Sequence, residues 1–486
     1  MFIKYYGFYG EGLRKYFNFW NMDKILNKIK KLIPRKLFRA LQPAYHFLLS
    51  FFAALVYRWP SEELIIIGVT GSTGKTTVVY MIAKMLEQAG YKVGYTSTAM
   101  FNDGNKEWLN DKKMTMVGRL FLQKMLRQMV KNGCHYAIVE TTSEGVVQFR
   151  HRFINFDYLI FTCLYPEHIE SHGNFENYKK AKGKLFAHLK KCKIKHVNGK
   201  NKVVKSESGI KKLDLRHVKK TTIVNGDDDY TDYFLNFWAE EKIVFTEKAD
   251  ASWPNVKVLH YQKIVDDSVG ASFRWENIDI HLRLLGEFNI TNAMSALSLG
   301  YALSLSAGML KKGLENIRGI PGRLERIDAG QDFIVIVDYA FEPNAVAKLY
   351  ETVADIPHNR IIHVLGSAGG GRDIARRPML GRLAGQTADY VIITNEDPYD
   401  DDPEIIIDQV ALGAEKEGKK IDVDLFRIID RKRAIIKAIS LAQSGDIVLI
   451  TGKGSEQAIC VADGKKIPWD DRLIAREIIK KKLSNE

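Results

Sequence analysis

The segment GVTGSTGKTT, residues 68–77, most constrains what this chain can fold into. It follows an apolar run, residues 64–67, and leads into a helix-like stretch, residues 75–90. A glycine-rich turn between a buried strand and a helix presents backbone N–H groups that bind phosphate. A strict GxxxxGK[ST] motif would need glycine at position 69, where this chain has Val69. The segment therefore predicts a phosphate-binding loop of a variant type.

The residue types of this loop indicate ATP with Mg²⁺. Lys75 is expected on the outer phosphates and Thr76 on the metal ion. The whole expected nucleotide loop consists of Gly71, Ser72, Thr73, Gly74, Lys75, Thr76 and Thr77. The alternative is a glycine-rich turn without a ligand. The loop alone leaves open whether the phosphate drives motion, is transferred to a hydroxyl, or activates a carboxylate.

The order of strand-like and helix-like segments predicts an α/β fold. After residue 64 strands and helices alternate, which is typical of a parallel sheet covered by helices. Residues 200–284 lose this rhythm and are expected to form an irregular edge of the same domain. Gly319, Pro321 and Gly322 suggest a hinge, and the strand-like segments 333–339, 361–366, 390–394 and 446–452 follow it. We expect a P-loop ATPase-type parallel-sheet domain at 63–319 and a Rossmann-like domain at 320–486.

Positive charge is concentrated at the N-terminus. The net charge is +14, but residues 1–60 contain eleven Lys/Arg and two acids, a local +9. The remaining chain is therefore not expected to bind nucleic acid. Residues 1–62 are expected to form a basic helical arm, because apolar residues recur between lysines at helical spacing in 24–41.

Two interpretations of this arm remain open: peripheral contact with an anionic membrane, and ordinary packing on the body of the protein. The apolar segment 47–57 is too short to span a bilayer, which needs about 20 residues. Four separated cysteines without a CxxC pair argue against a zinc site or disulfide framework and fit a reducing cytosol. We expect a cytoplasmic protein, with the inner face of the membrane as an alternative location.

The loop also resembles the P-loop of the Mur ligase superfamily, whose members form amide bonds through an acyl phosphate. The resemblance continues in family order over roughly residues 64–475. Its further blocks are ETTSEG, YPEHIESHGNFENYKKAKGKLF, NGDDD, GEFNITNA, PGRLERI, VDYAFEP, GSAGGGRDIARRP, TNEDPYDDDP and GKGSE. The chain looks most like the branch of UDP-N-acetylmuramyl-tripeptide synthetases, which add the third residue of the peptidoglycan stem peptide.

This resemblance implies a set of site residues. Glu140 and His168 match ligands of a second Mg²⁺, and Lys182 matches a lysine that the family carbamylates to help hold the metal. The expected catalytic residues are then Lys75, Glu140, His168 and Lys182. The expected metal site consists of Thr76, Glu140, His168 and Lys182. Further nucleotide contacts are expected from Asn289, Asn292, Arg323 and Asp338. The incoming amino acid is expected at Arg377, Glu396, Asp397, Tyr399, Gly452 and Glu456. Lys182 also has an alternative interpretation as part of a lysine-rich, solvated helix face.

The chain departs from the branch in places that concern its substrates. Glu396-Asp397-Pro398-Tyr399 replaces the usual DNPR, whose arginine grips a carboxylate of diaminopimelate, and three aspartates follow. Losing the guanidinium and gaining acids disfavours a second carboxylate and favours a side-chain ammonium. Alternatively, the acidic run is only a solvated loop. ETTSEG replaces EVSSHAL, and Phe341 replaces a histidine.

The residues before the P-loop, about 67, do not resemble the usual UDP-binding domain. Two explanations stay open: the basic arm holds the UDP end, or the acceptor is not the usual soluble nucleotide. We expect a monomeric, ATP-dependent carboxylate–amine ligase that joins an amino acid to UDP-N-acetylmuramyl-dipeptide or a related acceptor. The alternatives are a ligase of folylpolyglutamate, polyglutamate or cyanophycin type, and a membrane-recruited P-loop binding protein that has lost catalysis.

Overall fold

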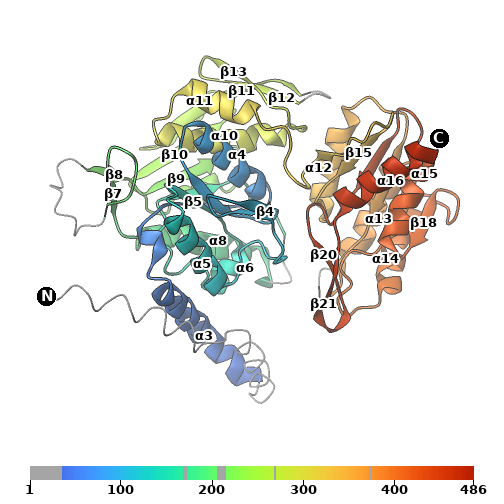
Figure 1. The fold of residues 1–486 in the computed structure, drawn as a ribbon, viewed down its shortest axis with the longest axis horizontal. Helices are drawn as coiled ribbons and strands as arrows, with labels where there is room; N and C mark the ends of the chain where they lie inside the picture. The colour runs from blue at the N-terminus through green and yellow to red at the C-terminus, as the bar shows by residue number, and fades with distance from the viewer. Residues whose placement is uncertain (1–34, 168–171, 205–214, 267–269, 372–373, 486) are drawn as a thin grey trace.

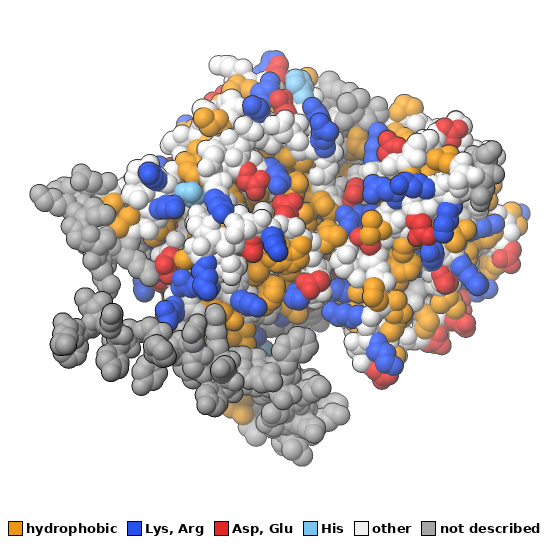
Figure 2. Space-filling view, in the orientation of Figure 1, with side chains coloured by type: hydrophobic (Ala, Val, Ile, Leu, Met, Phe, Trp, Pro, Cys, Tyr) orange, Lys and Arg blue, Asp and Glu red, His pale blue; other side chains and the backbone are white. Residues whose placement is uncertain are grey.

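The structure is a computed structural model, and it describes residues 35–167, 172–204, 215–266, 270–371 and 374–485. Two α/β domains lie side by side, and the helix α3 (Arg35–Val56) projects below the first of them (Figure 1). Basic and acidic side chains are interspersed over both domains on the face seen in Figure 2. The two α/β domains confirm the fold class that we expected from the sequence.

The first domain is built on an eleven-stranded sheet with the order β13-β12-β11-β10-β9-β6-β1-β5-β2-β3-β4. The strands from β11 to β2 in this order pair in parallel, and both edges are antiparallel. The strands are β1 (Ile65–Thr70), β2 (Val93–Thr96), β3 (Met100–Asn102), β4 (Glu107–Leu109), β5 (Tyr136–Glu140), β6 (Tyr158–Phe161), β9 (Thr221–Asn225), β10 (Glu241–Thr246), β11 (Lys257–Asp266), β12 (Ala271–Trp275) and β13 (Ile278–His281). A separate pair is β7 (Lys195–Val197) and β8 (Arg216–Val218).

Helices cover both faces of this sheet. One apolar core lies under α4 (Lys75–Gln88), α10 (Phe288–Ala302) and α11 (Ala307–Glu315). The opposite core lies under α5 (Arg119–Lys131), α8 (Phe175–Leu189) and α9 (Thr231–Leu235), with α6 (Ser143–Val147) contacting α8. Because both faces are covered, β1, β5 and β6 are buried along their whole length.

The prediction that residues 200–284 form an irregular edge was wrong for its larger part. β9, β10 and β11 continue the parallel sheet, and only β12 and β13 turn antiparallel. The β–α–β rhythm is hard to recognise here because α9, between β9 and β10, has only 5 residues. A helix that short shows no 3.6-residue periodicity in the sequence.

The second domain has a six-stranded sheet with the order β14-β15-β19-β16-β17-β18. Its strands are β14 (Glu325–Arg326), β15 (Ile334–Val337), β16 (Ile361–Leu365), β17 (Tyr390–Thr394), β18 (Leu425–Ile428) and β19 (Ile447–Ile450). One core lies under α12 (Pro343–Ala354), α13 (Arg376–Thr387) and α14 (Pro403–Glu415), and the other under α15 (Arg431–Leu441) and α16 (Asp471–Asn485). A β-hairpin, β20 (Ala458–Val461) and β21 (Lys465–Pro468), follows the sheet.

The helix α3 packs through one face only. Ser50 donates to the backbone oxygen of Phe149, and the ring of Phe51 lies 5.5 Å from that of Phe153. The apolar segment 47–57 therefore lies mostly within a helix that packs on the domain, which supports the ordinary-packing interpretation for that face. No helix in the described ranges is long and apolar enough to cross a membrane. Residues 24–34 of the predicted amphipathic segment lie outside the described residues.

Candidate active site

A cavity of about 1020 Å³ lies between the two domains. It is lined by the loop after β1, the ends of β5 and β6, the start of α10, and the loops after β15, β17 and β19. Apart from α10, each of these segments lies at the carboxyl end of a parallel strand. Ligands bind at that edge of an α/β sheet because the loops diverge there.

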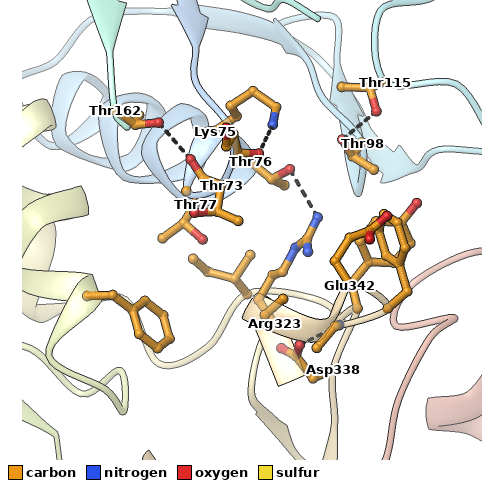
Figure 3. A pocket seen from close by; sticks show the side chains of 18 of the residues that line it. Thr73, Lys75, Thr76, Thr77, Thr98, Thr115, Thr162, Arg323, Asp338 and Glu342 are labelled. Carbon is orange, nitrogen blue, oxygen red and sulfur yellow. Dashed lines mark hydrogen bonds between the residues drawn. The ribbon is translucent and has the colours of Figure 1, made fainter. Parts of the chain in front are cut away.

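The predicted phosphate loop is held in shape by β6 and α8. The N–H of Ser72 donates to the backbone oxygen of Cys163. The hydroxyl of Thr162 donates to the backbone oxygen of Thr73 (Figure 3). Gly74 has φ 78°, and a Cβ there would lie 2.2 Å from Oδ1 of Asn292. Lys75 begins α4 and donates to the backbone oxygens of Gly71 and Ser72. The loop thus presents free N–H groups at a helix N-terminus, as a phosphate site requires.

Glu140 and Thr76 meet on the floor of the cavity. The hydroxyl of Thr76 lies 3.0 Å from Oε2 of Glu140, and the N–H and hydroxyl of Thr98 donate to the same carboxylate. Glu140 is buried at the end of β5. Hydroxyl and carboxylate oxygens are the ligands that Mg²⁺ prefers beside a phosphate chain, so these two side chains fit the ion.

The third expected metal ligand, His168, lies outside the described residues. Over the part of the chain that the structure describes, no group of three His, Cys, Asp or Glu side chains is arranged as a metal site. The second-ion site therefore stays a prediction.

Lys182 is almost fully buried, with 2% of its surface exposed, although its lysine neighbours Lys180 and Lys184 are exposed. Its Nζ donates to the backbone oxygen of Gly71 at 2.7 Å and lies 4.6 Å from the ring centre of Tyr178. Burial, together with the nearby charge of Lys75, lowers the pKa of Lys182 to about 7. The interpretation as part of a solvated helix face is therefore wrong for this residue.

The residues predicted around the nucleotide lie on both sides of the cavity. Asn289 donates to the backbone oxygen of Leu285, and Asn292 donates to Oδ1 of Asn289. Arg323 reaches from the start of the second domain and donates to the hydroxyl of Thr76 at 3.2 Å (Figure 3). Asp338 follows β15 and accepts from the N–H groups of Leu324 and Ala340. Burial raises the pKa of Asp338, against the opposing charge of Arg323.

Three of the residues predicted to hold the amino acid form an acidic group at the second domain. Glu396 and Asp397 follow β17, and Glu456 follows β19. Glu396 is 5% exposed, and burial raises its pKa. Its Oε2 has no hydrogen-bond partner among the described residues. Gly452 has φ 99°, and a Cβ there would lie 2.7 Å from that oxygen. Tyr399 also lines the cavity, beside Asp397 and Glu456.

Arg377 does not face this cavity. Its guanidinium donates to Gln409 and to the backbone oxygen of Ala368. The preceding residue, Arg376, lines the cavity and donates to Glu342 at 2.7 Å. The two arginines start the same helix, and adjacent helical residues point about 100° apart. Arg376 is therefore the arginine that can meet a ligand in this conformation.

Besides Arg376, further basic residues at the site were not predicted from the sequence, among them Lys453, Lys113 and Arg150. Lys453 is buried and pairs with Asp397 at 2.9 Å and Glu456 at 2.7 Å. Lys113 reaches the same two acids from the first domain. Arg150 lines the cavity, and in the described part of the chain its Nε has no hydrogen-bond partner. Lys453 lies inside the quoted GKGSE block, but no local pattern marks Lys113 or Arg150.

A P-loop domain that faces a second α/β domain across a nucleotide-sized cavity defines a two-domain, nucleotide-dependent enzyme. The chain belongs to the Mur ligase family: the Mur ligase middle domain matches residues 69–219 and 210–300, and the Mur ligase, glutamate ligase domain matches 322–454. The protein is accordingly an ATP-dependent, ADP-forming ligase that uses Mg²⁺.

Relatives of known name agree with this assignment. The UDP-N-acetylmuramyl-tripeptide synthetase of Roseiflexus sp. (strain RS-1) is 35% identical over 435 residues, which are 88% of this chain and 81% of the relative. The UDP-N-acetylmuramoyl-L-alanyl-D-glutamate–2,6-diaminopimelate ligase of Syntrophomonas wolfei is 31% identical over 441 residues, 90% of this chain and 82% of the relative.

Solved structures show the same fold. A UDP-N-acetylmuramoyl-L-alanyl-D-glutamate–2,6-diaminopimelate ligase is 26% identical, with a TM-score of 0.55, and the match covers 87% of this chain and 79% of that one. Folylpolyglutamate synthase of Mycobacterium tuberculosis matches with a TM-score of 0.59 at 15% identity, covering 86% and 96% of the two chains. At that identity the likeness concerns the fold alone.

Proposed function

We propose that the protein adds the third amino acid to UDP-N-acetylmuramyl-dipeptide in the cytoplasm, and that this amino acid carries a side-chain amine. One observation carries the proposal: the phosphate loop with Thr76 and Glu140 faces the acidic group of Glu396, Asp397 and Glu456 across one cavity. Carboxylate activation and amine attack need those two kinds of site next to each other. The names of relatives at 30–35% identity support this acceptor over folate or polyglutamate.

The first step forms an acyl phosphate. An oxygen of the acceptor carboxylate attacks the γ-phosphorus, the bond to the bridging oxygen breaks, and ADP leaves. Lys75 and the loop N–H groups stabilise the charge on the phosphate oxygens, and Arg323 adds a positive charge from the second domain. Thr76 and Glu140 would hold Mg²⁺, which would supply the positive charge that lets one anion approach another. Arg150 lines the cavity and adds positive charge for an anionic part of the acceptor.

The second step joins the amine. Its nitrogen attacks the acyl carbon, a tetrahedral intermediate forms, and phosphate leaves while the nitrogen loses a proton. Glu396 lines the cavity, and its carboxyl group can accept a hydrogen bond from a substrate amine. With Tyr399 in place of an arginine, this position no longer offers a guanidinium to a second substrate carboxylate. Lysine or ornithine therefore suits the site better than diaminopimelate.

We also propose that Lys182 is carbamylated. The neutral amine attacks CO₂ and releases a proton to solvent, which places an anionic carbamate beside the charge of Lys75. Both the near-complete burial of Lys182 and its lowered pKa favour a neutral amine. The product would place carboxylate oxygens next to the phosphate loop, where an oxygen ligand for Mg²⁺ is useful.

The ligase proposal is tested by ADP and phosphate release with ATP, Mg²⁺, UDP-N-acetylmuramyl-dipeptide and a panel of lysine, ornithine, diaminopimelate and glutamate. Release is expected only with acceptor and amine together, with lysine or ornithine favoured over diaminopimelate by about tenfold or more in kcat/KM. Release that needs no acceptor and no amine would overturn the ligase. A preference for diaminopimelate would overturn the substrate class alone.

We further propose that α3 binds the surface of an anionic membrane. Leu41, Tyr45, Leu48, Phe52 and Leu55 are exposed at spacings of three and four residues, so they form one apolar stripe on the helix. The sequence from residue 24 to 39 contains seven Lys/Arg, and no acid occurs between Asp23 and Glu62. An apolar stripe next to basic residues suits an interface of acyl chains and acidic headgroups.

Sedimentation of the full chain with phosphatidylglycerol-rich vesicles tests this surface. The double variant Leu48→Glu/Phe52→Glu is expected to bind on the order of tenfold more weakly, because two apolar side chains are lost and two negative charges are gained. Leu412→Glu, at an exposed position on α14, is the matched control and should bind like the parent. Equal sedimentation of the double variant and the parent would rule the surface out, as would no binding by the parent.

A further inference from the structure

Lys113 forms an ion pair across the two domains. It lies in the loop between β4 and α5, with φ 51°, and its side chain is 6% exposed. Its Nζ lies 2.6 Å from Oδ2 of Asp397, 2.8 Å from the backbone oxygen of Ala458 and 3.1 Å from Oε2 of Glu456. An ammonium has three N–H donors, so these three groups satisfy it completely.

The two acids already have a cation from their own domain. Lys453 is fully buried, and its Nζ lies 2.9 Å from Oδ1 of Asp397 and 2.7 Å from Oε2 of Glu456. Lys113 shares Oδ1 of Asp397 and Oε2 of Glu456 with Lys453 and also contacts Oδ2 of Asp397. Burial raises the pKa of Asp397, but Lys453 and Lys113 outweigh it and leave the pKa below its usual value, so the carboxylate stays charged. Lys113 therefore completes a charged subsite that lies in the ligand cavity.

We propose that Lys113 occupies the ammonium subsite of the incoming amino acid and is displaced when that amino acid binds, which makes it a specificity-determining residue. The inference rests on the proposed function, because it takes Asp397 and Glu456 as the amine-binding acids. A ligand without a positively charged amine cannot replace Lys113, since the two acids would be left with one buried cation between them. Selection for an ammonium then follows from competition with the protein's own lysine.

The same contact ties substrate binding to the position of the domains. In this conformation Lys113 joins the first domain to the loops after β17 and β19. The hydroxyl of Thr115, two residues further on, is hydrogen-bonded to that of Thr98 at 2.9 Å, and the N–H of Thr98 donates to Glu140. When the amino acid displaces Lys113, the loop that carries Lys113 and Thr115 therefore loses its contact with the second domain. This loop borders the metal-binding carboxylate of Glu140.

Steady-state kinetics of Lys113→Met test the proposal. The variant keeps the length of the side chain without the charge, so the KM for the amino acid should fall by about three- to tenfold, because no competitor has to be displaced. The KM for ATP should not change. Lys112→Met is the matched control, since Lys112 is an exposed neighbour paired with Asp111. An unchanged or raised KM for the amino acid in Lys113→Met would overturn the proposal.

Amine labelling of the unmodified protein provides a test that does not depend on the folding of a variant. An acylating reagent followed by peptide mass spectrometry should label Lys113 slowly in the free protein, and faster when ATP analogue and amino acid are saturating. Lys112 should react fast in both states, and Lys453 slowly in both. Lys113 that stays protected while the wild type ligates the amino acid would overturn the displacement. Absence of any ligation by the wild type would instead overturn the proposed function.

Discussion

Replacing Lys182 with alanine is expected to lower kcat for ligation by roughly 10²–10³-fold, the usual effect of removing one charged group that stabilises the transition state. The loss has two physical causes. The carbamate can no longer form, and the contact with the backbone oxygen of Gly71 is lost from the phosphate loop. Lys180→Ala, on the exposed side of the same helix, is the control and should retain activity.

Carbon dioxide separates the two causes. Wild-type protein stripped of CO₂ should lose activity and regain it on addition of bicarbonate, whereas Lys182→Ala should not respond. Labelled ¹³C-bicarbonate should give a carbamate carbon signal in the wild type that Lys182→Ala lacks. Full activity of CO₂-free protein, without such a signal, would restrict Lys182 to the structural contact with Gly71.

Replacing Asp157 with asparagine is expected to destabilise the first domain by about 3–5 kcal/mol. Asp157 is fully buried at the start of β6 and lies 2.5 Å from Nζ of Lys195 and 2.7 Å from Nζ of Lys220, both buried. Its carboxylate also accepts from the N–H of Ile66 in β1. Asparagine keeps the volume but leaves two buried ammonium groups without a counter-ion, which is more costly than losing a surface pair.

Urea unfolding followed by tryptophan fluorescence measures this effect as a lower transition midpoint. Asp279→Asn is the matched control, because Asp279 pairs with Arg274 on an exposed edge strand. The control should shift the midpoint little. Similar midpoints for the two variants would mean that Asp157, Lys195 and Lys220 are not all charged and paired in the folded protein.

Much of the fold was predictable because its signals are local. The loop at residues 68–77 and the alternation of apolar segments identified the P-loop and both sheets. Glu140, Asn289, Asn292 and Asp338 were recognised because the short blocks that contain them resemble those of the Mur ligase family. The sheet order around β9 and β10 was not predicted, since short connections hide the periodicity on which such a prediction depends.

The sequence by itself determined the phosphate loop, the ligase family and the acidic block at Glu396 and Asp397. Only the tertiary structure decided which arginine faces the cavity, that Lys182 is buried among exposed lysines, and that Lys113 meets Asp397 across 284 positions of sequence. The physical reason is that burial, helix facing and long-range charge pairing depend on how the two domains pack together. No local pattern of residues records that packing.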